Sequence, residues 1–182
     1  MIKIKSYKPN EINDCREASQ ISSTILDELV SYVSEGITTG EVDNYCLERI
    51  KKLGGIPAPL FYRGFPKPTC TSLNRVICHG IPSNDRKLLE GDILNVDITT
   101  IINGWHGDSS RMYKIGKVSV KANNLCEVTH QCLMESIKEI KVGDSISRIG
   151  KKIDEIANKN DLSVVRDFCG HGVGKNFHES PS

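Results

Sequence analysis

The sequence has few aromatic residues and no long apolar segment. Aromatic residues make up 5% of its 182 residues, so the core must be mainly aliphatic. No apolar run approaches the roughly 20 residues that a membrane-spanning helix needs. Residues 1–10 contain lysines but no apolar stretch behind them, so we expect no signal peptide. The lack of a membrane-spanning segment and of a signal peptide predicts a cytoplasmic protein.

The chain also lacks a charge excess and a cysteine framework. It has 24 basic and 23 acidic residues, a net charge of +1, which argues against a protein that coats nucleic acid. The seven cysteines include no C-x-x-C pair and are odd in number, so we expect free thiols rather than a disulfide scaffold. A hydrophobic content of 38% and a charged content of 26% are typical of a soluble globular domain.

Apolar spacing predicts two helices in the first part of the chain, over 10–35 and from Thr38 to about Leu53. Thr38 and Glu41 form a capping-box pattern at the start of the second helix. Gly36 and the pair at 54–55 are expected to end the two helices. The residues predicted to face inward are Ala18, Ile21, Ile25, Leu29, Val33, Val42, Cys46, Ile50 and Leu53.

A proline-rich loop over 56–68 follows the second helix. It carries Phe61, Tyr62 and Phe65, so it forms either a binding rim or a loop packed down by its own aromatic rings. Strands are predicted over 69–79 and 93–102, with a return strand over about 105–115.

The later part of the chain repeats this order of elements. A helix over 121–142 is ended by Gly143, and Ser145 is expected to cap a further helix. A short strand over 164–168 then leads into a glycine-rich turn. The residues predicted to face inward are Leu125, Val128, Cys132, Ile137, Ile140, Ile149, Ile153, Ile156 and Ala157. We expect one α+β domain over 1–182. Helix-turn-helix-strand is a common order and can recur by chance; a true repeat implies similar halves at about 1–118 and 119–182. The second half lacks the last pair of strands.

The hairpin around Asn103-Gly104 brings two carboxylates together. A two-residue turn pairs Ile102 with Trp105, so Asp97 lies diagonal to Asp108, roughly 7 Å away between backbones. Like charges at this distance repel unless a cation lies between them. One ion, or two ions about 3.5–4 Å apart, would bridge them. A lone Asp is more often a solvated surface residue, and a bulge at Gly107 would separate the pair.

Histidines in glycine-rich turns strengthen the case for a site. His79, His171 and His178 all lie in such turns, where the backbone can approach another group closely. We expect His106 and His130 to be structural or exposed. Cys70 and Cys78 carry no sign of activation in the sequence. The chain contains no H-E-x-x-H, G-x-S-x-G or P-loop motif, and its Gly-His-Gly-Val-Gly run is weak evidence for a nucleotide loop.

Four segments resemble the type I methionine aminopeptidases: residues 61–82, 91–97, 104–112 and 169–179. The resemblance implies the pita-bread fold, with two pseudo-symmetric αβ halves and a metal site between them. It implies removal of the N-terminal methionine from nascent chains whose second residue is small, by a metal-bound hydroxide at a dinuclear site. The related proline-specific peptidases usually show Asp-x-Gly where this chain has Asp97-Ile98-Thr99.

The resemblance also implies a role for each matching residue. Asp97, Asp108 and His171 match metal ligands for two divalent ions, which could be Co, Mn, Fe or Zn. His79 and His178 match histidines that contact the substrate amide and carbonyl. The residues that match walls of the methionine pocket are Tyr62, Phe65, Cys70 and Phe177, and Pro59 stands where relatives often carry Cys. The implied partners are nascent polypeptides and the ribosome, without nucleic-acid specificity or a membrane, and the full-length form is implied to be a monomer.

The sequence differs from the family pattern at one point that bears on activity. The family has two further glutamate ligands, which are expected beyond Ser182, and Glu179 does not replace either of them. We therefore expect weak metal binding and little or no activity from this 182-residue chain. The alternative hypothesis is a non-catalytic module that binds peptides or a partner on the same fold.

Overall fold

The computed structural model describes residues 5–182, so positions 1–4 of the predicted domain lie outside the described residues. The chain divides into two compact units. The first combines the chain up to Val118 with His171–Ser180, and the second combines Ser119–Gly170 with Pro181–Ser182. The predicted halves at 1–118 and 119–182 stay a prediction. Among residues 5–182, no helix is both long and apolar enough to cross a membrane.

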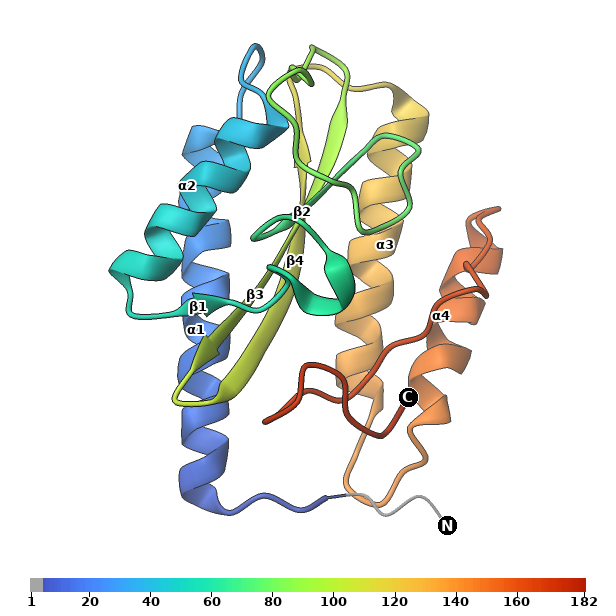
Figure 1. Cartoon of the computed structure of the whole chain (residues 1–182). Coiled ribbons are helices and arrows are strands. Elements are labelled where there is room, and N and C mark those ends of the chain that lie inside the picture. Colours follow the sequence, from blue (N-terminus) through green and yellow to red (C-terminus); the bar gives the residue numbers. More distant parts are fainter. Residues whose placement is uncertain (1–4) are drawn as a thin grey trace. The chain divides into compact units, whose positions relative to one another are not determined.

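An antiparallel sheet forms the centre of the first unit (Figure 1). Its strands are β1 (Ile56–Pro57), β2 (Cys70–Leu73), β3 (Ile93–Ile102) and β4 (Trp105–Lys114). The long strand β3 pairs with each of the other three. The β3–β4 register runs unbroken from the Ile93–Lys114 pair to the Ile102–Trp105 pair. The predicted hairpin is therefore confirmed, and no bulge interrupts it at Gly107.

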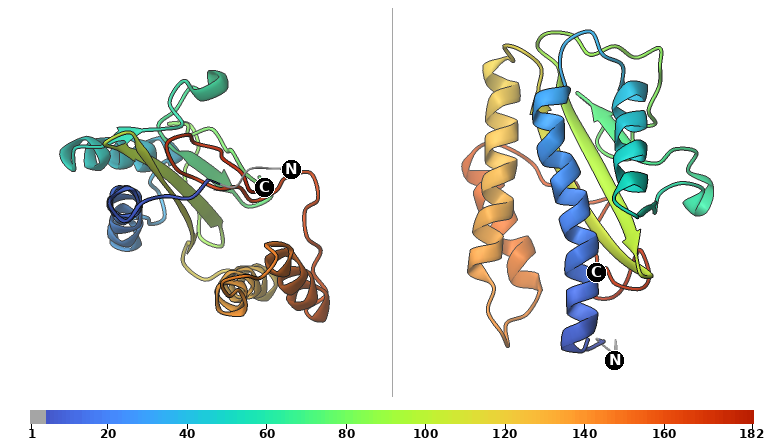
Figure 2. Two further views of the ribbon diagram at one scale, coloured as in Figure 1. Left: turned by 90° about the horizontal axis from the view of Figure 1, so that it is seen from below. Right: turned by 90° about the vertical axis from the view of Figure 1, so that its left-hand side faces the viewer.

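Two helices, α1 (Pro9–Tyr32) and α2 (Thr39–Lys52), cover one face of this sheet (Figure 2). Their inner faces meet Leu94, Val96 and Ile98 of β3 in one core, whose buried side chains are mainly aliphatic. The predicted capping box is confirmed, since Thr38 Oγ1 accepts from the Glu41 backbone and Glu41 Oε2 accepts from Thr38 N at 2.7 Å. Even-numbered β3 residues fill this core, so odd-numbered residues such as Asp97 point to the opposite face.

Two element ends and the exposure of one side chain in the first unit differ from the predictions. The first helix ends at Tyr32, before residue 35. Leu53 is the C-cap of α2 and is 36% exposed rather than buried. The strand predicted over 69–79 ends at Leu73, because Asn74 turns the chain with a positive φ of 53°.

The second unit contains α3 (Val120–Glu139) and α4 (Ser147–Lys159), which pack against each other. Their contact buries Val128, Cys132 and Ile156. Leu125 and Ile137 were predicted to face inward but are 42% and 59% exposed, because α4 covers only the side of α3 that carries Val128 and Cys132.

Two further predictions in the second unit are wrong. Ser145 is not the N-cap of α4: Ile146 takes that position, and Ser145 lies one residue earlier, where its Oγ accepts from Ser147 N at 3.4 Å. The segment 164–168 is not a strand. A strand needs a ladder partner, and no part of the chain between 5 and 182 pairs with this segment.

Gly150 lies inside α4 with open space around it, and an added Cβ would meet no atom within 4 Å. We expect Gly150→Ala to raise the free energy of unfolding by about 0.5–1 kcal/mol, because glycine loses more backbone entropy than alanine in a helix. Urea unfolding followed by circular dichroism checks this. A loss of stability would mean that α4 is not a regular helix at this point.

Candidate metal and substrate site

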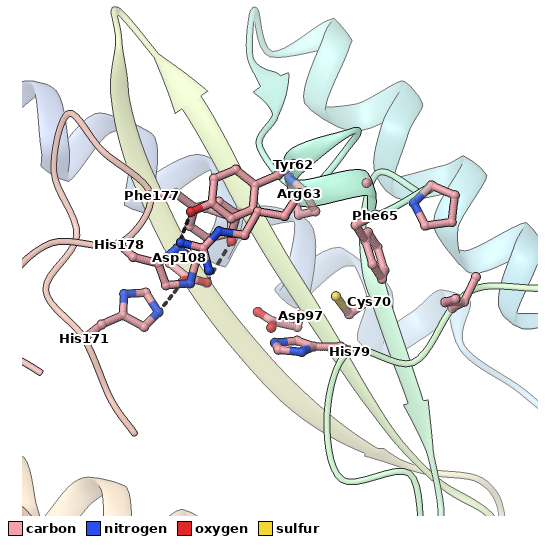
Figure 3. A pocket seen from close by; sticks show the side chains of 15 residues that line it. Tyr62, Arg63, Phe65, Cys70, His79, Asp97, Asp108, His171, Phe177 and His178 are labelled. Carbon is pink, nitrogen blue, oxygen red and sulfur yellow. Dashed lines mark hydrogen bonds and ion pairs between the residues drawn. The ribbon is translucent and has the colours of Figure 1, made fainter. Parts of the chain in front are cut away.

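A cavity of about 470 Å³ lies in the first unit (Figure 3). Its walls come from the loop around Tyr62–Phe65, from β2 to β4, from the turn after β2 and from the segment after Gly170. Every site residue predicted from the sequence lines it: Tyr62, Phe65, Cys70, His79, Asp97, Asp108, His171, Phe177 and His178.

The hairpin places two carboxyl groups in the cavity. Asp97 pairs with Ser110, and Asp108 pairs with Thr99, so the two aspartates are diagonal neighbours, as predicted. Thr99 Oγ1 donates a hydrogen bond of 2.9 Å to Asp108 Oδ1. Burial and the neighbouring Asp108 carboxyl raise the pKa of Asp97 to about 7. A bound divalent cation would oppose both effects, so this pair suits a metal ion.

His171 and His178 enter the cavity from the glycine-rich segment. His171 Nε2 lies 3.7 Å from Asp108 Oδ2, and its Nδ1 lies 3.0 Å from the Gly172 carbonyl oxygen. The two imidazole rings are 4.2 Å apart between centroids. Within residues 5–182, however, no three His, Cys, Asp or Glu side chains converge closely enough to form a metal-binding group. The structure brings the predicted ligands near one another without closing them around one point.

A hydrogen bond with Tyr62 orients His178. Tyr62 Oη lies 3.0 Å from His178 Nδ1, and the Tyr62 ring also packs 4.9 Å from the Phe177 ring between centroids. Burial and the neighbouring His171 lower the pKa of His178 below its ordinary value. This shift favours the neutral imidazole, in which one nitrogen is a donor and the other an acceptor.

Cys70 forms part of the cavity wall beside the acidic pair. It pairs directly with Asp97 across β2 and β3. Burial, together with Asp97 and Asp108, raises the pKa of the Cys70 thiol to about 12. A neutral thiol is a poor nucleophile, so Cys70 contributes shape rather than reactivity.

The turn after β2 holds His79 at the cavity. His79 has a positive φ of 53°, and a Cβ at Gly80 would lie 2.2 Å from the Thr71 carbonyl oxygen. Thr71 N donates to the Gly80 carbonyl oxygen at 2.8 Å, which presses the turn against β2. Figure 3 shows His79 beside Asp97 and Cys70 as a result.

Some lining residues were not identified from the sequence. Thr99 lines the cavity, and the same register that paired it with Asp108 could have identified it. Arg63 also lines the cavity and stands 5.4 Å from the Tyr62 ring centroid, but no pattern pointed to it. His106 is buried against the Gly174 carbonyl oxygen and His130 is exposed, which fits the structural or exposed roles predicted for them.

Comparison with known proteins supplies independent evidence. The profile of metallopeptidase family M24 matches residues 13–182. A methionine aminopeptidase of Rickettsia prowazekii is 42% identical over 98% of this chain and 69% of its own length. The methionine aminopeptidase of Escherichia coli K12 is 39% identical over 95% of this chain and 66% of its own length. The chain thus spans about two thirds of the length of these curated relatives.

Solved structures of methionine aminopeptidases show the same similarity to this chain. The crystal structure of the Rickettsia prowazekii methionine aminopeptidase superposes with a TM-score of 0.94, covering 100% of this chain and 72% of that one. The Thermotoga maritima methionine aminopeptidase, 34% identical, also gives 0.94 with the same coverage. An X-Pro aminopeptidase from Thermotoga maritima, 20% identical, gives 0.78 and shows a shared fold only.

Proposed function

This chain belongs to metallopeptidase family M24 and has the predicted α+β pita-bread fold, and from this we propose that it is a metal-dependent aminopeptidase that removes N-terminal methionine. The observation that carries the proposal is the cavity in which the acidic pair, the histidines and the apolar wall meet. A non-catalytic binding module is not favoured, since the similar curated proteins are named as aminopeptidases over nearly this whole chain.

The family implies a divalent metal cofactor, and the donors in the cavity suit one. We propose that Asp97, Asp108 and His171 hold it, and that the complete site takes two ions. Carboxylate and imidazole ligands accept Mn, Fe, Co or Zn. When bound, the metal supplies a Lewis acid that activates water and polarises the scissile carbonyl. Because a two-ion site needs carboxylates on both sides, we expect weak binding by these three ligands alone.

The remaining cavity residues position the substrate. The side chain of the N-terminal methionine enters the apolar part formed by Tyr62, Phe65, Cys70 and Phe177, which suits a flexible thioether. Tyr62 Oη lies 3.0 Å from His178 Nδ1, and with the hydroxyl as donor the proton of the neutral ring stands on Nε2. His178 Nε2 and His79 can then donate to the substrate carbonyl and amide region and stabilise charge as it develops.

Some features of the proposal rest on the family resemblance and the composition. We propose that the protein acts in the cytoplasm as a monomer, and that it contacts the ribosome to reach nascent chains with a small second residue. The net charge of +1 supports the absence of nucleic-acid specificity.

The test is release of free methionine from Met-Ala-Ser with added Mn²⁺ or Co²⁺. We expect release that is weak at most, that EDTA abolishes and that Asp97→Asn abolishes. Binding is measured separately by NMR, where Met-Ala-Ser should shift signals of cavity residues and Lys-Ala-Ser should not. Release that survives EDTA and Asp97→Asn would contradict the proposal, and so would equal binding of the two peptides.

A further inference from the structure

The segment from His171 to Glu179 carries two of the three histidines of the site, His171 and His178, and is closed into a loop. Gly172 and Glu179 exchange two backbone hydrogen bonds, each of 2.8 Å. The Gly174 carbonyl oxygen accepts from His106 N at 2.8 Å, which ties the middle of the loop to β4. His171 and His178 therefore stand at the two ends of this closed loop, and its placement decides theirs.

Glu179 is the centre of a polar cluster on this loop, away from the cavity lining. Its Oε1 accepts from Asn176 N at 2.8 Å and from Asn176 Nδ2 at 3.0 Å. Its Oε2 accepts from the Tyr7 hydroxyl. Both carboxylate oxygens thus accept hydrogen bonds from this chain, and Glu179 is not among the residues that line the cavity.

Tyr7 comes from the segment just before α1, 172 residues away in the sequence. Its ring stands edge-on to the Trp105 ring, 5.0 Å between centroids and at 76°. Trp105 is only 2% exposed and begins β4, so it gives Tyr7 a rigid support. Burial and Glu179 raise the pKa of Tyr7 to about 12, so its hydroxyl remains a donor at neutral pH.

Gly174 leaves the space that this contact needs. A Cβ at Gly174 would lie 2.3 Å from the Tyr7 hydroxyl oxygen and 2.7 Å from Glu179 Oε2. The last glycine of the Gly-His-Gly-Val-Gly run thus admits Tyr7 rather than a phosphate group. The glycine-rich loop and the segment before α1 fit together as one unit.

We propose that Tyr7 and Glu179 are positioning residues for His171 and His178, so that the segment before α1 fixes the loop of the active site. The proposal rests on the proposed function for what the two histidines do. The contacts themselves are independent of that function. Loss of the Tyr7 hydroxyl bond frees Glu179 Oε2, and the adjacent His178 then samples positions away from Tyr62.

The test compares Tyr7→Phe with Tyr45→Phe. Both variants remove a tyrosine hydroxyl bound to a glutamate and keep the ring, since Tyr45 donates to Glu28 at 3.3 Å between α2 and α1. The first readout is the ¹⁵N-detected imidazole spectrum of the metal-free 182-residue chain. The second is the Co²⁺ dissociation constant.

We expect Tyr7→Phe to shift and broaden the His171 and His178 imidazole signals and to weaken Co²⁺ binding about three- to tenfold. Tyr45→Phe should leave both readouts unchanged. Glu179→Gln, which keeps the shape but loses one acceptor, should act in the same direction as Tyr7→Phe.

If Tyr7→Phe and Tyr45→Phe lower the unfolding midpoint alike and neither changes the imidazole signals, the inference is overturned. If the imidazole signals change only in Tyr7→Phe while the wild-type chain binds neither Co²⁺ nor Met-Ala-Ser, the positioning role stands and the proposed function fails. If metal and peptide bind and Tyr7→Phe changes nothing, the inference alone fails.

Discussion

Gly107→Ala is expected to lower the free energy of unfolding by more than about 3 kcal/mol. A Cβ at Gly107 would lie 2.2 Å from the Ala18 carbonyl carbon and 2.2 Å from Ser19 N, both backbone atoms of α1. No side-chain rotation can relieve this overlap. The helix must move away from β4, and it carries much of the aliphatic core with it.

Hydrogen bonds at the same place make the movement more costly. Ser22 Oγ donates to the Gly107 carbonyl oxygen at 2.8 Å, and Thr100 Oγ1 donates to the Ala18 carbonyl oxygen at 2.8 Å. Ser22 and Thr100 are fully buried, so separating helix and sheet leaves these polar groups without partners. Gly107 also precedes Asp108, so the shift reaches the proposed metal site.

Urea unfolding at equilibrium measures the effect, with Gly150→Ala as the control for the same chemical change without a clash. The expected outcome is a lower midpoint for Gly107→Ala and a slightly higher one for Gly150→Ala. A Gly107→Ala protein as stable as the wild type would show that α1 does not pack this closely on β4.

Asp97→Asn is expected to change metal affinity and stability in opposite directions. It removes a charged ligand, so we expect Co²⁺ affinity to fall at least about 100-fold. In the metal-free chain it removes the repulsion between two partly buried carboxylates, so at pH 8 we expect the free energy of unfolding to rise by about 2 kcal/mol. A residue with a purely structural role would not show this pairing.

The stability gain has a defined pH dependence. The pKa of Asp97 is raised from 3.8 to about 7 in the folded chain, by burial first and by Asp108 second. Between these two pKa values the folded state keeps a proton on Asp97 that the unfolded state has lost. Stability therefore falls as the pH rises from the lower value to the higher one. The cost is complete above about pH 7, so the gain from Asp97→Asn should be large at pH 8 and small at pH 4.

Unfolding by urea in EDTA at the two pH values measures this, with the exposed Asp85→Asn as a control. A gain of the same size at both pH values would contradict the account of the carboxylate pair. So would a loss of stability at pH 8.

The sequence alone was sufficient to predict the acidic pair. An Asn-Gly turn fixes the register of a hairpin, and the alternation of side chains fixes the face, so the Asp97–Asp108 diagonal followed from local rules. The glycine-rich turns pointed to the histidines, while their roles and the apolar wall came from the resemblance, and the cavity places all of them together. The aliphatic core followed from the same alternation in β3.

Other features depend on contacts that no local pattern records. The Tyr7–Glu179 bond joins residues 172 positions apart, and neither side chain belongs to a periodic apolar stretch. The exposed side of α3 could not be predicted either, since periodicity shows that a helix has an apolar side but not how much of it a neighbour covers. The segment 164–168 has strand-like composition, but composition cannot supply the partner that a strand needs.

The most direct test of whether Asp97, Asp108 and His171 hold the metal is a Co²⁺ titration of the 182-residue chain, followed by visible absorption. The account predicts weak but saturable binding that is lost in Asp97→Asn, Asp108→Asn and His171→Ala and is retained in Asp85→Asn. Binding that is equally strong in all five proteins, or no binding by the wild-type chain at any Co²⁺ concentration, would show that these three residues do not hold the metal.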